Sequence, residues 1–189
     1  MDVYFKKQIT YFYEGIKFTF NVGNTLFSTF DIDHGTDILL RSISFKNPKS
    51  ILDLGCGYGP IGIVLAKKFP SAQVTLLDKD LLAVRYSQYN IKENAIDNAS
   101  AFGSVGLEQV NGEMFDLIVS NIPAKIGDEA ITTDFILTPY SHLNPNGELW
   151  MVIVSALNHL IPKVAMKNKL NLKKIRKRHG HIVYQILKK

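Results

Sequence analysis

The stretch that decides the fold is Ile51-Leu52-Asp53-Leu54-Gly55-Cys56-Gly57-Tyr58-Gly59, in which a buried-strand pattern runs straight into a glycine-rich turn. Glycine allows a tight turn without a Cβ penalty and lets a ligand come close to main-chain N–H groups. Asp53 lies near the end of the strand, and we expect its carboxylate to accept a hydrogen bond from a cationic or hydroxylic part of that ligand. The stretch therefore predicts a turn that holds a small nucleoside ligand.

The same residues also fit a second kind of site. Gly57-Tyr58-Gly59-Pro60-Ile61-Gly62 matches the G-x-G-x-x-G pattern of dinucleotide sites, and Asp78 follows about twenty residues on, as that pattern requires. The match is weak alone, because glycines in a strand-to-helix turn can serve packing only. A nucleoside cofactor, a dinucleotide and a purely structural turn all stay open at this point.

Composition indicates one well-packed domain with small additions. The chain has 189 residues, of which 46% are hydrophobic and 21% charged. The N-terminus has no signal-peptide order, and the longest apolar run, 149–154, is too short to span a bilayer. The single cysteine, Cys56, excludes an intrachain disulfide and a cysteine-rich zinc site. We therefore expect a cytoplasmic protein without a membrane partner, in which Cys56 fills space.

Charge is distributed unevenly along the chain. Residues 162–189 contain ten Lys or Arg and no acid, whereas the first 161 residues hold 12 basic and 17 acidic residues. A basic end on an acidic body is typical of a polyanion-binding edge, but it also fits a solvated, solubilising face. Arg176, Lys177 and Arg178 are the candidate phosphate contacts.

Apolar periodicity from residue 50 onward predicts alternating strands and helices. Strands are expected at 73–78, 100–102, 115–120, 148–154 (entered through a turn at 144–147), 172–177 and 182–187, and helices at 60–69, 81–94, 133–142 and 157–169. Such alternation predicts an α/β fold with a doubly wound, mostly parallel seven-stranded sheet, ending in an antiparallel hairpin. Ahead of it, 11–20 reads as a small β-hairpin turning at Glu14-Gly15, followed by a helix at 37–43. Residues 1–45 are thus expected to be an extension packed on a 46–189 core within a single domain.

The polar residues that could carry chemistry follow the ends of predicted strands. Asp53, Asp78, Ser104 and Asn121 stand at or just beyond such ends. Ligands of open parallel sheets bind outside the carboxyl ends of the strands, where the strand order reverses. An acid such as Asp78 can accept hydrogen bonds from both hydroxyls of a ribose, which requires an adenosine but not a dinucleotide.

Asn121-Ile122-Pro123 is similar to the N-P-P-Y motif of methyltransferases that act on planar, amide-like nitrogens. The lone pair of such a nitrogen is delocalised, so the nitrogen is a poor nucleophile. Two acceptors, the Asn121 side-chain oxygen and the Ile122 carbonyl, would hold the NH₂ group and favour a tetrahedral nitrogen in line with a sulfonium methyl. Pro123 would fix the backbone that carries the second acceptor.

Taken together, the chain resembles class I S-adenosylmethionine-dependent methyltransferases, in the methyltransferase small domain group that includes small-subunit ribosomal RNA guanine-N2 methyltransferases. The resemblance rests on Phe27-Ser28, Asp33-His34-Gly35-Thr36, the 53–59 turn, Asp78, the Arg85, Asn90 and Asn94 helix, and Ser120-Asn121-Ile122-Pro123-Ala124 with Gly127. It implies a Rossmann-like fold and S-adenosylmethionine as the cofactor. The implied cofactor-binding residues are Asp53, Gly55, Cys56, Gly57, Asp78, Lys79, Ser104 and Asn121; the implied catalytic residues are Asn121, Ile122 and Pro123.

Two positions depart from the family pattern. The family usually has an aromatic residue at Ala124 to stack on the target base, so stacking would have to come from Phe27, Phe30 or Tyr58. It also usually has an Asp near Ser104 that meets the adenine amino group. These departures raise the alternative of a protein that binds RNA and methylates poorly or not at all.

The leading hypothesis is an enzyme that methylates an exocyclic amino group of a base in RNA, with ribosomal RNA guanine N2 as the expected target. A glutamine amide in a protein is the alternative substrate of the same chemistry. A nicotinamide-dependent oxidoreductase is a further alternative, but it leaves Asp53 and Asn121 unexplained. No metal is expected, because methyl transfer to nitrogen needs none and the histidines lack convincing ligand spacing.

Overall fold

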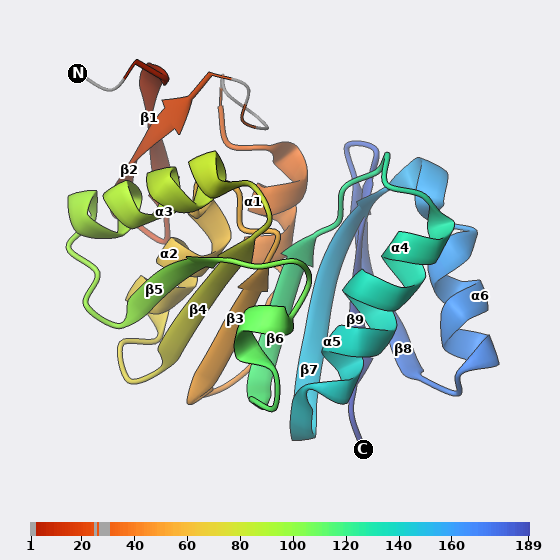
Figure 1. The fold of residues 1–189 in the computed structure, drawn as a ribbon. Helices are drawn as coiled ribbons and strands as arrows, with labels where there is room; N and C mark the ends of the chain where they lie inside the picture. Colours follow the sequence, from red (N-terminus) through yellow and green to blue (C-terminus); the bar gives the residue numbers. More distant parts are fainter. Residues whose placement is uncertain (1–2, 25, 27–30) are drawn as a thin grey trace.

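A seven-stranded sheet forms the centre of the molecule in a computed structural model that describes residues 3–24, 26 and 31–189 (Figure 1). Its strands, in spatial order, are β5 (Ala99–Gly103), β4 (Gln73–Asp78), β3 (Ser50–Leu54), β6 (Phe115–Asn121), β7 (Leu143–Val154), β9 (His181–Leu187) and β8 (Asn171–Arg178). The first five run parallel, and β9 is antiparallel to both β7 and β8. The predicted α/β class and the C-terminal antiparallel hairpin are confirmed.

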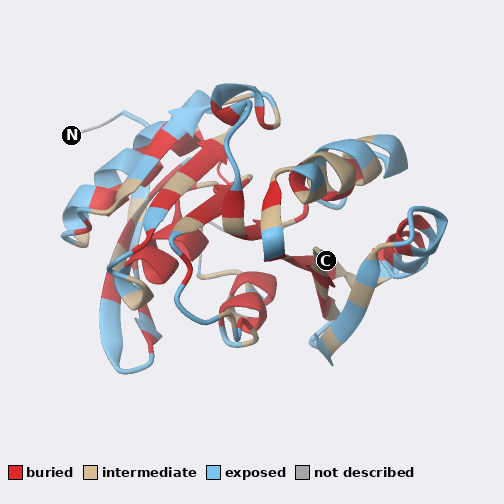
Figure 2. Cartoon of the chain, turned by 90° about the horizontal axis from the view of Figure 1, so that it is seen from below, coloured by how far each residue is buried: buried red, intermediate tan, exposed pale blue. Residues whose placement is uncertain are grey.

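Helices cover both faces of this sheet. They are α1 (His34–Leu40), α2 (Pro60–Lys68), α3 (Leu81–Glu93), α4 (Asp128–Thr132), α5 (Thr138–Ser141) and α6 (Leu160–Lys167), with short turns η1 (Glu108–Val110), η2 (Thr133–Leu137) and η3 (Ser155–Leu157). Neighbouring strand residues point to opposite faces, so Ile51 packs in the cluster with α1, α2 and α3, whereas Leu52 packs with α4, η2 and α6. The strands therefore form a buried layer between helices with exposed outer sides (Figure 2).

A two-stranded N-terminal sheet, β1 (Phe5–Tyr13) and β2 (Ile16–Gly23), packs on α3. It turns at Glu14-Gly15, both with left-handed φ, as predicted. The side-chain amides of Asn90 and Asn94 on α3 each accept from and donate to the backbone of β2, at Asn21 and Thr19. These amides pair with β2 as a neighbouring strand would, and they attach the hairpin to the core. The division of the chain into a 1–45 extension and a 46–189 core stays a prediction.

Several predicted elements differ in their bounds from those observed. The helix expected at 37–43 is α1 at 34–40, the helix expected at 157–169 is α6 at 160–167 after the turn η3, and the hairpin expected at 11–20 extends over 5–23. The helix expected at 133–142 begins earlier, at Asp128, and passes through the π turn η2 before α5. Pro139 has no N–H for the carbonyl of Phe135, which accounts for the wider hydrogen-bond spacing ahead of it. The strand expected from residue 148 starts at Leu143, because residues 144–147 form an irregularity within β7. Gly147 and Asn146 are hydrogen-bonded to the backbone of Lys188, which holds this bend in the sheet.

Candidate active site

The candidate site lies at the carboxyl edge of the sheet between β3 and β6, where the strand order reverses. Asp53 is paired with Val119, so the two strands end side by side. The Ser120 hydroxyl donates to the carbonyl of Leu54 over 2.8 Å, which fastens the two ends together. The residues that follow, Gly55 on one strand and Asn121 on the other, are therefore neighbours.

The glycine-rich turn uses its own N–H groups to build its shape. Gly55 and Cys56 both donate to the carbonyl of Leu77, and Gly59 donates to Cys56. Gly57 donates to the carboxylate of Asp78 over 2.8 Å. Gly55, Gly57 and Gly59 all have positive φ, and a Cβ at Gly57 would meet no atom within 4 Å. The turn thus offers a ligand open space beside Gly57, whereas the N–H groups of Gly55, Cys56, Gly57 and Gly59, which we had expected to be free, bond within the protein.

Asp53 lies beneath this turn and is fully buried. Its Oδ2 accepts the N–H of Gly62 in the first turn of α2 over 2.7 Å, whereas its Oδ1 is buried without a protein partner. Burial raises the pKa of the Asp53 carboxyl from 3.8 to about 7, against the lowering effect of the Gly62 bond. Asp53 therefore supports the turn and leaves one buried acceptor.

This pKa makes a prediction for stability. Between about pH 4 and pH 7 the folded chain keeps a proton on Asp53 that the unfolded chain has released, so stability falls as pH rises through that window. Asp53→Asn keeps an acceptor for Gly62 and removes the titration. We expect the free energy of unfolding of the variant to rise relative to that of the wild type from pH 4 to pH 7, by up to about 4 kcal/mol. Above pH 7 the difference should not change further. Urea unfolding across this pH range measures it, and a pH-independent difference would contradict a raised pKa.

Asp78 closes β4 beside the turn and is half-buried. Its Oδ2 accepts from Gly57 and its Oδ1 accepts from the N–H of Asp80 over 2.9 Å. Each carboxylate oxygen has a second lone pair, so both can still accept from a diol. Lys79, which follows, is exposed, and the Ser104 hydroxyl is engaged within its own loop, donating to Gly106 and accepting from Gln109.

The side chain of Cys56, within the turn, is buried. Its Sγ lies 3.6 Å from both the Gly57 carbonyl and the Ser87 hydroxyl. Burial raises the pKa of the Cys56 thiol, so the thiol stays neutral and is not activated as a nucleophile. A space-filling role agrees with these contacts.

Asn121 points its amide at the start of α1. Its Nδ2 donates to Asp33 Oδ2 over 2.7 Å and to Thr36 Oγ1 over 3.1 Å. Ile122 is buried and its N–H donates to the carbonyl of Val152, whereas Pro123 is exposed. Asp33 and Thr36 were noted above only among the residues that resemble the family. No local sequence pattern predicts their contact with Asn121.

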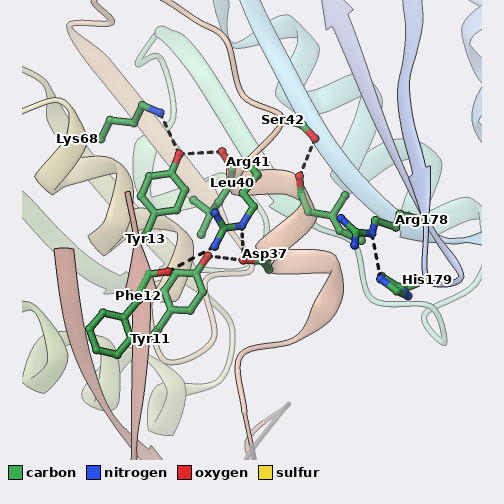
Figure 3. Close-up of polar contacts among 11 residues, drawn as sticks. Tyr11, Phe12, Tyr13, Asp37, Leu40, Arg41, Ser42, Lys68, Arg178 and His179 are labelled. Atoms are coloured by element: carbon green, nitrogen blue, oxygen red, sulfur yellow. Dashed lines mark hydrogen bonds and ion pairs between the residues drawn. The ribbon is translucent and has the colours of Figure 1, made fainter. Parts of the chain in front are cut away.

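The N-terminal hairpin holds α1 in this place (Figure 3). The Tyr11 hydroxyl donates to Asp37 over 2.7 Å, and the Tyr13 hydroxyl donates to the carbonyl of Leu40 over 3.1 Å. Arg41 forms an ion pair with Asp37 at 2.8 Å. The hairpin is therefore linked to the site through α1.

The aromatic residue found near the site is not one of those predicted to stack on a target base. Phe27 and Phe30 lie outside the described residues. Tyr58 is only 3% exposed and packs edge-on against Phe20, so its ring has no open face for a base. Phe135, from η2, comes within 3.6 Å of the position of a Gly55 Cβ. This proximity was not predicted, because the apolar pattern of 133–142 indicated an ordinary core helix.

The tip of the β8–β9 hairpin reaches the same edge of the sheet. Gly180 accepts the N–H of Ser155 just after β7 ends, and the rings of His34 and His179 are 5.6 Å apart. The residue before His179 is Arg178, which donates to the His179 ring and is exposed, as are Arg176 and Lys177 (Figure 3). Of the predicted basic residues, Arg178 thus comes close to the N-terminus of α1 through its bond to His179.

Two further findings concern only the described residues. Within 3–24, 26 and 31–189, no three His, Cys, Asp or Glu side chains form a group that could hold a metal ion. In the same ranges, every helix is too short or too polar to cross a membrane.

Comparison with known proteins gives consistent matches. The family model "Methyltransferase small domain" matches residues 17–185. The uncharacterized protein YbxB of Bacillus subtilis is 35% identical over 140 residues, which is 72% of this chain and 68% of that protein. The ribosomal RNA small subunit methyltransferase C of Haemophilus influenzae is 36% identical over 135 residues, which is 70% of this chain but only 40% of that protein.

A solved structure shares the fold over most of the chain. It is the T. thermophilus 16S rRNA N2 G1207 methyltransferase in complex with AdoMet and guanosine, with a TM-score of 0.84 and 23% identity. The match covers 97% of this chain and 50% of that one.

Proposed function

The chain belongs to the methyltransferase small domain family, and from this premise we propose that it transfers a methyl group from S-adenosylmethionine to an exocyclic amino group of a base in RNA. The predicted family and enzyme class are confirmed by the family match. The RNA substrate, with ribosomal RNA guanine N2 as the first candidate, is the proposed part, as is a cytoplasmic location. Relatives whose names give a ribosomal RNA activity are much longer than this chain, which spans 40% of the one from H. influenzae.

The glycine turn supports a cofactor that presents hydrogen-bond donors. The half-buried carboxylate of Asp78 is an acceptor that suits the ribose hydroxyls of S-adenosylmethionine, and the fully buried Asp53 supports the turn from beneath. A dinucleotide pyrophosphate needs free N–H donors at the start of α2. There Gly62 already donates to buried Asp53, and Gly57 donates to Asp78. Because these two N–H groups are already used within the protein, the turn argues against the oxidoreductase alternative.

Asn121 is the residue that we assign to the substrate amine. When bound, S-adenosylmethionine supplies an electrophilic methyl group on a sulfonium. The Asn121 Oδ1 would accept a hydrogen bond from one N–H of the amine, and the carbonyl of Ile122 would accept a hydrogen bond from the other. Two acceptors below the plane of the amine favour a pyramidal nitrogen, whose lone pair is then available for attack. Ile122 is buried and its N–H is bonded to the carbonyl of Val152, so the backbone that carries the proposed acceptor carbonyl is held in place.

One observation supports the choice of RNA over a protein substrate: a short series of contacts links the basic hairpin tip to Asn121 through His34 and Asp33. His179 stacks on His34, whose neighbour Asp33 accepts from Asn121. We therefore assign Arg178, which bonds to the His179 ring, to a phosphate next to the target base. Alternatively, the charges of β8 only protect an edge strand from pairing with other chains. That role would not require the charged residues to lie beside the candidate site.

A methyl-transfer assay tests this function. Purified protein is incubated with tritiated S-adenosylmethionine and either unmodified 16S ribosomal RNA transcript or a glutamine-containing protein pool. Incorporation into RNA, recovered as N2-methylguanosine after digestion, is the expected result. Incorporation only into protein would replace the substrate class. Binding of S-adenosylhomocysteine and RNA without any incorporation would support the non-catalytic alternative instead.

Replacing Arg176, Lys177 and Arg178 together by alanine is expected to weaken RNA binding about tenfold to a hundredfold at low salt. Each lost phosphate contact also removes about 0.9 from the slope of log affinity against log salt concentration, so the plot flattens by about 2 to 3. Filter binding across a salt series measures both quantities.

Lys67→Ala with Lys92→Ala is the matched control, because both residues are exposed on helices α2 and α3, away from the hairpin. We expect the control to change the salt slope little. Equal losses in the two variants would mean that RNA recognises overall charge, and no loss in the hairpin variant would remove β8 from the interface.

A further inference from the structure

We infer that Asp33, assisted by Thr36, is a positioning residue that fixes which end of the Asn121 amide faces the substrate. The inference rests on the proposed function, because it concerns how the acceptor for the amine is oriented. Its evidence is the pair of hydrogen bonds that join α1 to the end of β6, between residues 88 and 85 positions apart.

The chemistry of the partners sets the orientation. A carboxylate is only an acceptor, so the group of Asn121 that approaches Asp33 Oδ2 at 2.7 Å must be its NH₂. Thr36 Oγ1, at 3.1 Å, accepts from the same NH₂. The Asn121 carbonyl oxygen then faces away from α1. The selected substrate atom is therefore a hydrogen-bond donor, such as an amino group.

Without these partners the amide has two nearly equivalent orientations. One presents the oxygen to the substrate, and the other presents the NH₂, which would oppose the NH₂ of the substrate. Only the first orientation is competent for catalysis, so a residue that favours it raises the competent fraction before the substrate arrives. A bond to a carboxylate is well suited to this, since charge-assisted hydrogen bonds are about twice as strong as neutral ones.

The surrounding backbone holds the Asp33 carboxylate in place. Asp33 is the N-cap of α1, and its Oδ2 also accepts the N–H of Thr36 over 3.1 Å. Gly35 makes room for it, because a Cβ there would come within 2.8 Å of Asp33 Oδ2 and 2.9 Å of His181. Thr36 is itself buried. Asp33 thus cannot easily swing away from Asn121.

Variants at Asp33 separate the positioning role from the capping role. Serine caps a helix as well as aspartate does, but its hydroxyl ends too close to the backbone to reach Asn121. Asparagine caps equally well and keeps an oxygen that can accept from both Thr36 and Asn121. We expect Asp33→Ser to lower kcat for methylation of the ribosomal RNA transcript about tenfold to a hundredfold, and Asp33→Asn to restore most of that loss.

Further variants complete the series. Thr36→Val removes the hydroxyl acceptor but not the backbone N–H, and together with Asp33→Ser it is expected to lower kcat more than either change does alone. Asp97→Ser, at an exposed acid in the bend before β5, is the control for loss of a carboxylate and should leave kcat unchanged. The affinity for S-adenosylhomocysteine, measured by calorimetry, should stay the same in all of them, because the effect is on the acceptor for the amine.

The Asn121 side-chain amide gives a readout that needs no substrate. Its ¹⁵N–¹H signals are identified by their loss in Asn121→Asp. In the wild type and Asp33→Asn we expect slow solvent exchange and contacts to the Thr36 methyl group, and in Asp33→Ser faster exchange. The exposed Asn111 serves as the reference for an unrestrained amide.

The two readouts separate the possible failures. Exchange of the Asn121 amide as fast as that of Asn111 in the wild type would overturn the inference whatever the activity. Equal kcat for Asp33→Ser and wild type would also overturn it, since only the cap would then matter. A protected amide in a protein that methylates neither RNA nor protein would refute the proposed function and leave the positioning contact established.

Discussion

Asn121→Ala is expected to lower kcat for RNA methylation about a thousandfold while changing the affinity for S-adenosylhomocysteine no more than about threefold. The side-chain oxygen is the acceptor that we assign to the amine, and it acts mainly when the nitrogen becomes pyramidal. The ribose and the amino-acid part of the cofactor are assigned to Asp78 and the glycine turn instead. Single-turnover rates with tritiated S-adenosylmethionine, beside calorimetric titrations, measure the two quantities.

Asn111→Ala is the control for this change, because Asn111 is exposed just after η1. A thermal melt of each variant detects any loss of folding, which is expected to be small since Asn121 is only half-buried. Should Asn121→Ala keep more than about a tenth of the wild-type kcat, the amine must be held elsewhere, and the assignment of Asn121 would be wrong.

Asp78→Ala is expected to weaken S-adenosylhomocysteine binding by two to three orders of magnitude, or about 3 to 4 kcal/mol. Two effects combine: the acceptors for the ribose hydroxyls are lost, and so is the bond from Gly57 that ties the glycine turn to the end of β4. Asp78→Asn keeps part of both and should give an intermediate loss. Calorimetric titration of the ligand into each variant provides the comparison.

Asp80→Ala is the matched control, because Asp80 lies in the same bend but caps α3 by accepting from Leu82 over 2.8 Å. We expect it to cost about 1 kcal/mol of stability and little affinity. Comparable losses of affinity in the two variants would mean that the shape of the bend matters and not the Asp78 carboxylate. No binding by the wild type would leave Asp78 without its proposed role.

Much of the fold followed from local patterns. The 73–78 strand and the 60–69 and 81–94 helices lie within a residue of those observed. Apolar periodicity sets all three, and Pro60 and the cap Asp80 mark where the two helices begin. The helices expected at 37–43 and 157–169 start three residues away from the observed α1 and α6. The other errors fell where hydrogen bonding is irregular, at the π turn η2 and at the bend inside β7. No periodic pattern distinguishes those from a regular helix or a simple turn.

The candidate site divides in the same way. Local pattern alone was enough to put Asp53, Asp78 and Asn121 at strand ends. Because the strand ends of a parallel sheet meet at one edge, the proximity of these residues could be inferred. It did not indicate that Asp53 would be fully buried or that the turn amides would be used internally, because burial depends on what packs above each residue.

Only the tertiary structure decided how α1 and the C-terminal hairpin meet the site. The contact of Asp33 with Asn121 joins residues 88 positions apart, and the stacking of His34 on His179 joins segments still further apart in the chain. Periodicity reports which face of an element is buried but not which other element covers it. Partners such as these are chosen by the packing of whole helices and strands, and that packing is settled only when the chain has folded.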